Sequence, residues 1–180
     1  AVEQRAAAVP DVVATVGMLE VPSGSINVVP GRCRFSLDVR STTDTARDAC
    51  AADLQAALRA LCERRGLSFT LEETMRAPAA PSAAAWQARW EQAVTALGLP
   101  VHRMPSGAGH DAMKLHEIMP QAMLFTRGEN AGISHNPLES TSSHDIDLCV
   151  AAFQSLLDQL AQDRAAGTPD TPRPTTRTQP

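Results

Sequence analysis

The sequence predicts an α/β protein in two parts, and three patterns along its 180 residues support this fold class. Residues 1–75 combine apolar runs that have the two-residue period of strands with one long stretch that has helical period. A Pro- and Ala-rich segment follows at 76–82, and residues 83–163 return to mainly helical periodicity. We therefore expect a first domain over 1–75, a hinge over 76–82, a second domain over 83–163 and a disordered tail over 164–180.

The first domain opens on residues 1–8, which have the pattern of the last turns of a helix that Pro10 ends. Residues 11–19 are rich in β-branched side chains and predict a strand. Residues 33–40 alternate cleanly between apolar and polar and predict a second strand. One face of that strand carries four apolar side chains, namely Cys33, Phe35, Leu37 and Val39.

A long helix is predicted from the N-cap candidates at 41–44 to about Arg65, with Gly66 suited to the position after its last turn. Its apolar stripe consists of Cys50, Leu54, Ala57, Leu58 and Leu61. Residues 67–74 alternate again and predict a further strand. The resulting order matches a partial ferredoxin-like βαββαβ domain that lacks its first strand and most of its first helix.

The second domain is predicted to hold a helix over about 83–97, and a loop at 106–112 that opens another helix. The apolar run 121–126 has the length of a buried strand. Ser142 and Asp145 have the spacing of a capping box for a last helix that ends near residue 162. The predicted core stripe of this helix is Ile146, Val150, Phe153, Leu157 and Leu160.

Composition excludes several classes of function. The apolar fraction is 43%, the charged fraction is 20% and the net charge is -4, as in soluble globular proteins, so we expect no nucleic-acid partner. No apolar run approaches the length of a membrane span. The four cysteines have no metal-like spacing, and we expect buried, reduced thiols and a cytoplasmic location.

His135 is the first candidate for chemistry. It stands between Gly132 and the Asn136–Pro137 pair, on a predicted tight turn that would present an imidazole to a metal or a substrate. Glu139 is close enough in sequence to accept the second ring N–H. The alternative is a turn histidine that is bonded to the local backbone.

Two further candidates have weaker patterns. His110 and Asp111 follow a Gly-Ala-Gly sequence where a helix begins, a place that suits an anion, although Asp111 could simply complement the helix dipole. Arg40 ends its strand on the polar face and, paired with Asn27, could clamp a substrate carboxylate. The alternative for Arg40 is a solvated charge.

Three strings carry a resemblance to a known family: INVVPGRCRFSLDVR at 26–40, PSGAGHDAM at 105–113 and GISHNPLES at 132–140. In order and spacing they resemble the allantoate amidohydrolase and N-carbamoyl-L-amino-acid hydrolase group of the M20 metallopeptidase superfamily. The resemblance covers about residues 1–162. It implies that 1–75 form most of a lid domain, which pairs with its copy in a homodimer, and that 83–163 form the C-terminal half of a zinc-peptidase-like α/β catalytic domain.

The resemblance also implies roles for single residues. His135 matches a ligand of a centre of two divalent metal ions, zinc or manganese. Asn27 and Arg40 match lid residues that grip the substrate in the opposite subunit, the arginine through the substrate carboxylate. Gly109 and His110 match residues that line the substrate pocket.

The family's other metal ligands and its general base have no counterpart in this sequence, so no catalytic residue is assigned. We therefore expect the C-terminal portion of a metal-dependent amidohydrolase that cleaves the C–N bond of allantoate or an N-carbamoyl-L-amino acid. By itself the chain would bind metal partially at most, since metal centres need three or four ligands, and would be inactive. The alternative is a non-catalytic dimerisation or binding module.

Overall fold

The computed structural model describes residues 1–167 of the chain. Contacts within the chain divide it into two compact units, one of residues Ala1–Ala79 and one that begins at Ala80, and each has its own hydrophobic core. The architecture is mixed helix and sheet, as the sequence predicts. The predicted tail begins within the last helical turn, and its residues 168–180 lie outside the described part.

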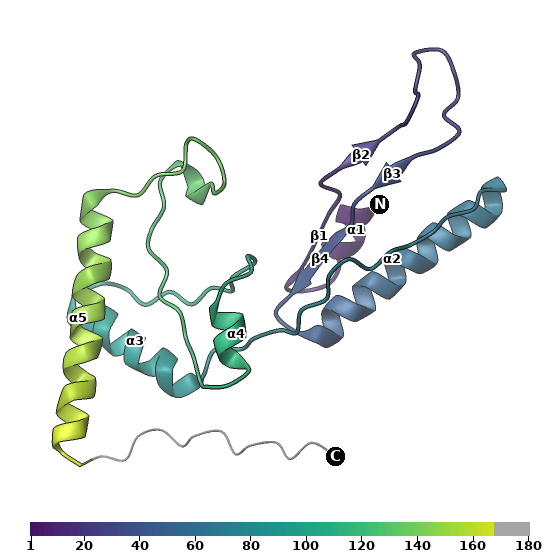
Figure 1. Cartoon of the computed structure of the whole chain (residues 1–180). Helices are drawn as coiled ribbons and strands as arrows, with labels where there is room; N and C mark the ends of the chain where they lie inside the picture. The colour runs from purple at the N-terminus through teal and green to yellow at the C-terminus, as the bar shows by residue number, and fades with distance from the viewer. Residues whose placement is uncertain (168–180) are drawn as a thin grey trace, which may run out of the picture. The chain divides into compact units, whose positions relative to one another are not determined.

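The first unit is built on one long antiparallel hairpin (Figure 1). Its base pairs β1 (Val12–Thr15) with β4 (Asp38–Ser41), and its outer part pairs β2 (Leu19–Glu20) with β3 (Arg34–Phe35). The predicted strand over 33–40 is therefore present, but as two short strands.

A bulge separates the two parts of this hairpin. Thr15 lies opposite Asp38, whereas the next backbone hydrogen bond runs from the Ser36 N–H to the Met18 carbonyl at 3.1 Å. Residues 16–17 thus face Leu37 alone, which is the two-against-one count of a β-bulge. Because a bulge disrupts the ladder locally, it accounts for the break between β1 and β2 and between β3 and β4.

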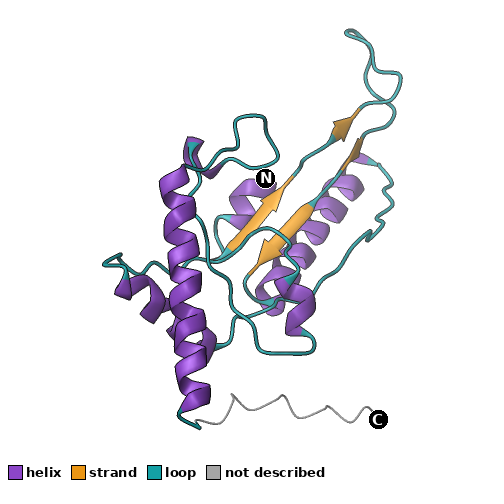
Figure 2. Ribbon diagram, turned by 60° about the vertical axis from the view of Figure 1, so that its left-hand side comes forward, coloured by secondary structure: helices purple, strands orange, loops and turns teal. Residues whose placement is uncertain are grey.

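Two helices cover one face of the hairpin base (Figure 2). They are α1 (Val2–Ala6) and α2 (Asp44–Arg65), and both contact β1. The Thr43 hydroxyl accepts a hydrogen bond from the Ala46 N–H at 3.3 Å, and Gly66 ends α2 with a φ of +65°, so both predicted helix boundaries are confirmed. The buried core of this unit is Ala6, Val12, Ala14, Cys50 and Leu54.

Several predictions for this unit are wrong. Residues 67–74 form no strand, because no strand among residues 1–167 pairs with them, and their Leu67 and Leu71 side chains are exposed. Cys33 is exposed rather than buried, since no helix of the described chain contacts β3, which begins at the next residue. In α2, Leu61 is exposed and Cys62 is buried in its place.

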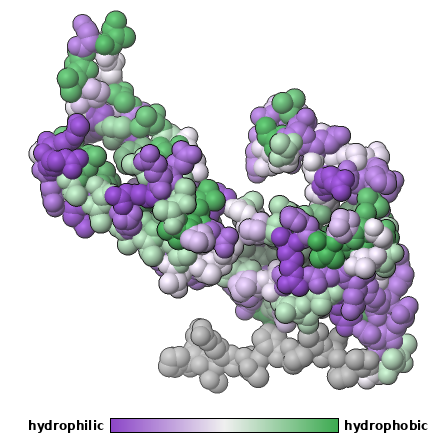
Figure 3. Space-filling model, turned by 180° about the vertical axis from the view of Figure 1, so that it is seen from behind, coloured by the Kyte–Doolittle hydropathy of each residue, from purple (hydrophilic) through white to green (hydrophobic). Residues whose placement is uncertain are grey.

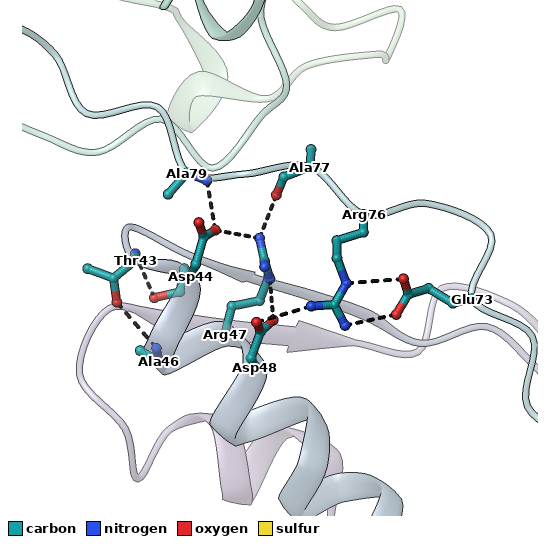
Figure 4. A network of polar contacts seen from close by, with 10 residues as sticks. Thr43, Asp44, Ala46, Arg47, Asp48, Glu73, Arg76, Ala77 and Ala79 are labelled. Atoms are coloured by element: carbon teal, nitrogen blue, oxygen red, sulfur yellow. Dashed lines mark hydrogen bonds and ion pairs between the residues drawn. The ribbon is translucent and has the colours of Figure 1, made fainter. Parts of the chain in front are cut away.

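A polar network fastens residues 73–79, the linker segment, to the first turn of α2 (Figure 4). Its centre is Arg47, which is only 16% exposed and donates to Asp44 at 2.7 Å, to Asp48 at 2.9 Å and to the Ala77 carbonyl. The Asp44 carboxylate also accepts a hydrogen bond from the Ala79 N–H at 2.8 Å. The last residues of the first unit are therefore held to a helix although they have no secondary structure of their own.

Arg76 extends this network and makes it sensitive to acid. It bonds Glu73 through two nitrogens, at 3.1 and 3.0 Å, and Asp48 at 3.1 Å. The hydrogen bond from Arg76 lowers the pKa of Glu73, and the hydrogen bond from Arg47 lowers the pKa of Asp48. Because both carboxyl pKa values are lowered on folding, their stabilisation is present at neutral pH and is lost as the pH falls through the lowered values.

Acidification is therefore expected to loosen the linker segment in the range of about pH 4.5 to 3. A carboxyl ¹³C NMR titration should give Glu73 a midpoint below its ordinary value in the native chain. In Arg76→Met the pKa of Glu73 should return toward that value, because the guanidinium donors are gone. An unchanged Glu73 titration in the variant would contradict the network.

The second unit is helical in its regular parts. It holds α3 (Ala84–Ala96), α4 (Ala112–His116), the 3₁₀ turn η1 (Asn130–Gly132) and α5 (Ser143–Ala165). Helices α3 and α5 pack on one another around Ala93, Ala152 and Leu156. The Ser142 hydroxyl caps α5 by accepting from the Asp145 N–H at 3.1 Å, as the sequence predicts.

Two predictions for the second unit are wrong. Residues 121–126 are not assigned as a strand, since they have no backbone ladder with any residue of the described chain. Gln121, at their start, is instead buried and fastened to residues 80–83, with its carbonyl accepting from the Ala83 N–H at 2.7 Å. The predicted stripe of α5 is mostly exposed, because the residues that α3 buries, Ala152 and Leu156, lie beside it; its exposed members are Ile146, Val150, Phe153 and Leu157. Two of the predicted members still contact the helix pair: Leu160 packs against the core, and the Phe153 ring lies edge-on to that of Trp90, with ring centroids 5.1 Å apart.

Candidate functional site

His135 lies in a loop of residues 128–140, which we call the His135 loop. The loop is closed at its base, where the Glu129 N–H donates to the Ser140 carbonyl at 2.9 Å and the Ser140 hydroxyl donates to the Glu129 carboxylate at 2.7 Å. The Asn130 amide donates to the Leu138 carbonyl at 2.7 Å across the loop. The predicted turn at His135 is therefore present and is held by contacts within the loop.

The backbone of His135 has a φ of +55°, which is uncommon for a residue with a side chain. The Glu139 carboxylate accepts a hydrogen bond from the His135 backbone N–H at 2.9 Å. The expectation that Glu139 bonds the imidazole ring is therefore wrong in this structure. No described residue bonds the His135 ring, so its two nitrogens are available.

Gly109 and His110 precede α4, where the sequence predicts a helix start. The His110 ring accepts a hydrogen bond from the Ala112 N–H through Nδ1 at 3.1 Å, which leaves Nε2 to carry the proton when the ring is neutral. Asp111 is the N-cap residue of this helix, but its side chain makes no cap hydrogen bond. A Cβ added at Gly109 would meet only the Met113 sulfur at 4.0 Å, so the position has open space beside it.

Asn27 lies in the turn at the tip of the hairpin, between Ser25 and Val28, which form an isolated bridge. Its side-chain oxygen accepts a hydrogen bond from the Ser25 hydroxyl at 3.0 Å. Apolar side chains are exposed around it, and Figure 3 shows them at the end of the protruding hairpin. Two of them, Ile26 and Val29, are almost fully exposed.

Arg40 lies in β4 at the base of the same hairpin, opposite Val13. Two of its guanidinium nitrogens, Nε and Nη2, each donate to one oxygen of the Asp38 carboxylate at 2.8 Å. This bidentate hydrogen bond lowers the pKa of Asp38. The guanidinium of Arg40 thus donates two hydrogen bonds to one carboxylate, the geometry expected for a substrate carboxylate, although here the carboxylate belongs to its own strand.

Asp38 and Asn130 contact the candidate site residues or their loop but are not among the residues predicted from the sequence. Asp38 could have been found, because residues two apart in a strand lie on the same face and the Asp-x-Arg pair therefore meets. Asn130 has no such signal, since its contact with Leu138 depends on the closed shape of the loop.

Apart from the neighbours Gly109 and His110, the predicted site residues lie in separate places within their units. In the first unit, Asn27 is at the tip of the hairpin and Arg40 is at its base, with β2 and β3 between them (Figure 1). In the second unit, His110 and His135 occupy different loops and have different partners. Among residues 1–167 no three or more His, Cys, Asp or Glu side chains come together to hold a metal ion, so a complete metal centre does not fit the described residues. No helix among them is long and apolar enough to cross a membrane.

Several relatives of the chain are named as hydrolases that act on amide bonds. The chain is 34% identical over 162 residues to the N-carbamoyl-L-amino acid amidohydrolase of Geobacillus stearothermophilus, covering 89% of this chain and 39% of the relative. It is 31% identical over 147 residues to the allantoate amidohydrolase of Bacillus subtilis, covering 82% of this chain and 35% of that relative. A solved amidase of the hydantoinase/carbamoylase family from Burkholderia multivorans superposes with a TM-score of 0.81 at 30% identity, covering 88% of this chain and 39% of that one.

The family described as Peptidase family M20/M25/M40 matches residues 3–159, and the chain belongs to this family. The resemblance seen in the three sequence strings is thereby confirmed. The chain spans little more than a third of the length of the curated relatives it matches.

Proposed function

We propose that this chain is the C-terminal portion of a metal-dependent amidohydrolase that hydrolyses the C–N bond of allantoate or an N-carbamoyl-L-amino acid. The named relatives and the family match support the class of reaction. The observation that best supports the site is the geometry of His135, whose backbone has a positive φ and whose ring is bonded by no residue among 1–167. In this proposal His135 is one metal ligand, and the remaining ligands and the general base come from polypeptide beyond the described residues.

The bound metal would supply an activated water and a polarised carbonyl. This chain's own residues would bind and orient the substrate. Allantoate and N-carbamoyl amino acids both carry a carboxylate, which suits the bidentate fork of Arg40, and Asp38 would have to give way to it. The Asn27 amide, Gly109 and His110 would contact the rest of the substrate.

The domain roles are part of the same proposal. Residues 1–75 would form a lid that pairs with its copy in a homodimer, 76–82 a hinge, and 83–163 the C-terminal part of a catalytic domain in a cytoplasmic enzyme. Support for a further polypeptide partner comes from the exposed apolar face of α5, because a helix that is apolar on several faces is normally buried on them. Sedimentation of the purified chain would show whether the 180 residues form a dimer by themselves.

The ligand assignment is tested by metal binding and turnover of the purified 180-residue chain. We expect no measurable hydrolysis of allantoate or N-carbamoyl amino acids in the presence of zinc or manganese, because one histidine cannot form the centre. Weak zinc binding should be lost in His135→Ala and retained in the control His102→Ala. Robust turnover would contradict the partial-site proposal, and unchanged zinc binding in His135→Ala would contradict the ligand role.

A further inference from the structure

The backbone at His135 is held in a conformation that its sequence alone does not favour. A residue with a Cβ in the left-handed region costs about 1–2 kcal/mol relative to the right-handed one. Such a residue persists only where its surroundings determine it. The His135 loop must therefore contain contacts that compensate for the φ of +55° at its apex.

The contact that reaches the apex is made by Glu139. Its carboxylate Oε2 accepts from the His135 N–H at 2.9 Å, and an ionised acceptor makes a stronger hydrogen bond than a neutral one. Asn136 fixes the residues between them, with its side-chain oxygen accepting from the Leu138 N–H at 3.0 Å and its carbonyl accepting from the Glu139 N–H at 2.9 Å. The Asn130 bond to the Leu138 carbonyl ties this turn to the base of the loop.

The same arrangement leaves the imidazole without a hydrogen bond from any residue that the structure describes. Glu139 lies four residues after His135 and could have bonded the ring, but its carboxylate bonds the backbone instead. Both ring nitrogens therefore remain available to a ligand, while the direction of the Cα–Cβ bond is fixed by the backbone.

We infer that Glu139 is a positioning residue for His135: its carboxylate holds the left-handed turn from which the imidazole is presented. The inference rests on the proposed role of His135 as a metal ligand. It differs from the usual arrangement around metal-binding histidines, in which a carboxylate bonds the second ring nitrogen. It also gives Glu139 a function that does not require contact with the metal.

The test compares Glu139→Ala with Glu139→Gln in the full chain. The amide oxygen of glutamine can still accept from the His135 N–H, whereas alanine leaves this N–H without its partner. We expect hydrogen exchange of the His135 amide to accelerate at least about 10-fold in Glu139→Ala and by less than about 3-fold in Glu139→Gln. Exchange within α5 should be unchanged in both variants, which shows that the unit remains folded.

Cobalt(II) provides a second readout, because a paramagnetic ion broadens the NMR signals of a ring that it contacts. In Glu139→Ala, about 10-fold more cobalt should be needed to broaden the His135 ring signals, in line with the loss of a residue that orients a ligand. Glu139→Gln should restore most of the native response. Unchanged amide exchange in Glu139→Ala, or equal losses in both variants, would overturn the inference. If cobalt does not affect His135 in the native chain, the proposed function fails, while the exchange data still decide the role of Glu139.

Discussion

Replacing Arg47 with methionine is expected to release residues 77–79 from α2 and to lower the free energy of unfolding of the first unit by about 1–2 kcal/mol. Arg47 is largely buried, and its guanidinium donates hydrogen bonds to Asp44, to Asp48 and to the Ala77 carbonyl. Methionine preserves much of the buried stem but none of the donors. The partially exposed aspartates can turn to water, which keeps the expected loss moderate.

The measurement is hydrogen exchange of the Ala79 amide, whose acceptor is the Asp44 carboxylate that Arg47 orients. We expect this amide to exchange about 10-fold faster in Arg47→Met. Arg59→Met is the matched control, because Arg59 is exposed on the same helix and makes no ion pair among the described residues. Equal effects of the two substitutions would show that the linker segment does not depend on Arg47.

This network constrains part of residues 76–82, where a hinge stays a prediction. Composition predicts a hinge over 76–82, but within the first unit residues 77–79 are bonded to α2. Within the second unit, Gln121 bonds Ala83, and its side-chain amide donates to the carbonyls of Ala80 and Pro81 at 3.4 Å each. Each end of the predicted hinge therefore belongs structurally to its own unit, which Pro and Ala content alone does not reveal.

Helices were predictable because their signals are local. The Thr43 cap and Gly66 define the ends of α2, and the Ser142 cap defines the start of α5. The strands predicted at 67–74 and 121–126 are not formed within the described residues. A strand forms only when a second segment completes its backbone hydrogen bonds. Alternation and apolar character show which residues suit a sheet, but not whether a partner is present.

In the candidate site, too, features set by local sequence could be predicted and features set by the folded shape could not. A turn at His135 follows from glycine, asparagine and proline placed around it, and the structure contains this turn. The atom that Glu139 bonds could not be predicted, because backbone and ring N–H groups are both within its reach in sequence. The bond between Arg40 and Asp38 is consistent with their spacing in the strand, whereas the predicted partner of Arg40 is a substrate carboxylate.

Leu156 and Leu157 are neighbours in α5 that are expected to differ sharply when truncated. Leu156 is 5% exposed and belongs to the core formed with α3, whereas Leu157 is 50% exposed. Leu156→Ala should lower the free energy of unfolding of the second unit by about 2–4 kcal/mol, because it removes buried apolar surface and leaves a cavity. Leu157→Ala should change it by less than about 1 kcal/mol.

Urea denaturation of the two variants, followed by the fluorescence of Trp86 and Trp90, measures this difference, because both tryptophans pack against the same core. Equal losses would mean that the face carrying Leu157 is covered in solution, for instance by a second copy of the chain, and a dependence of stability on protein concentration would identify that case. If the losses differ as expected, Leu157 is an exposed apolar residue of α5 that contributes little to the stability of this unit, unlike Phe153, whose ring lies 5.1 Å from the ring of Trp90 on α3. Exposed apolar side chains such as those of Val150 and Leu157 are explained by contact with further polypeptide, as the proposed role of the chain in a larger amidohydrolase requires.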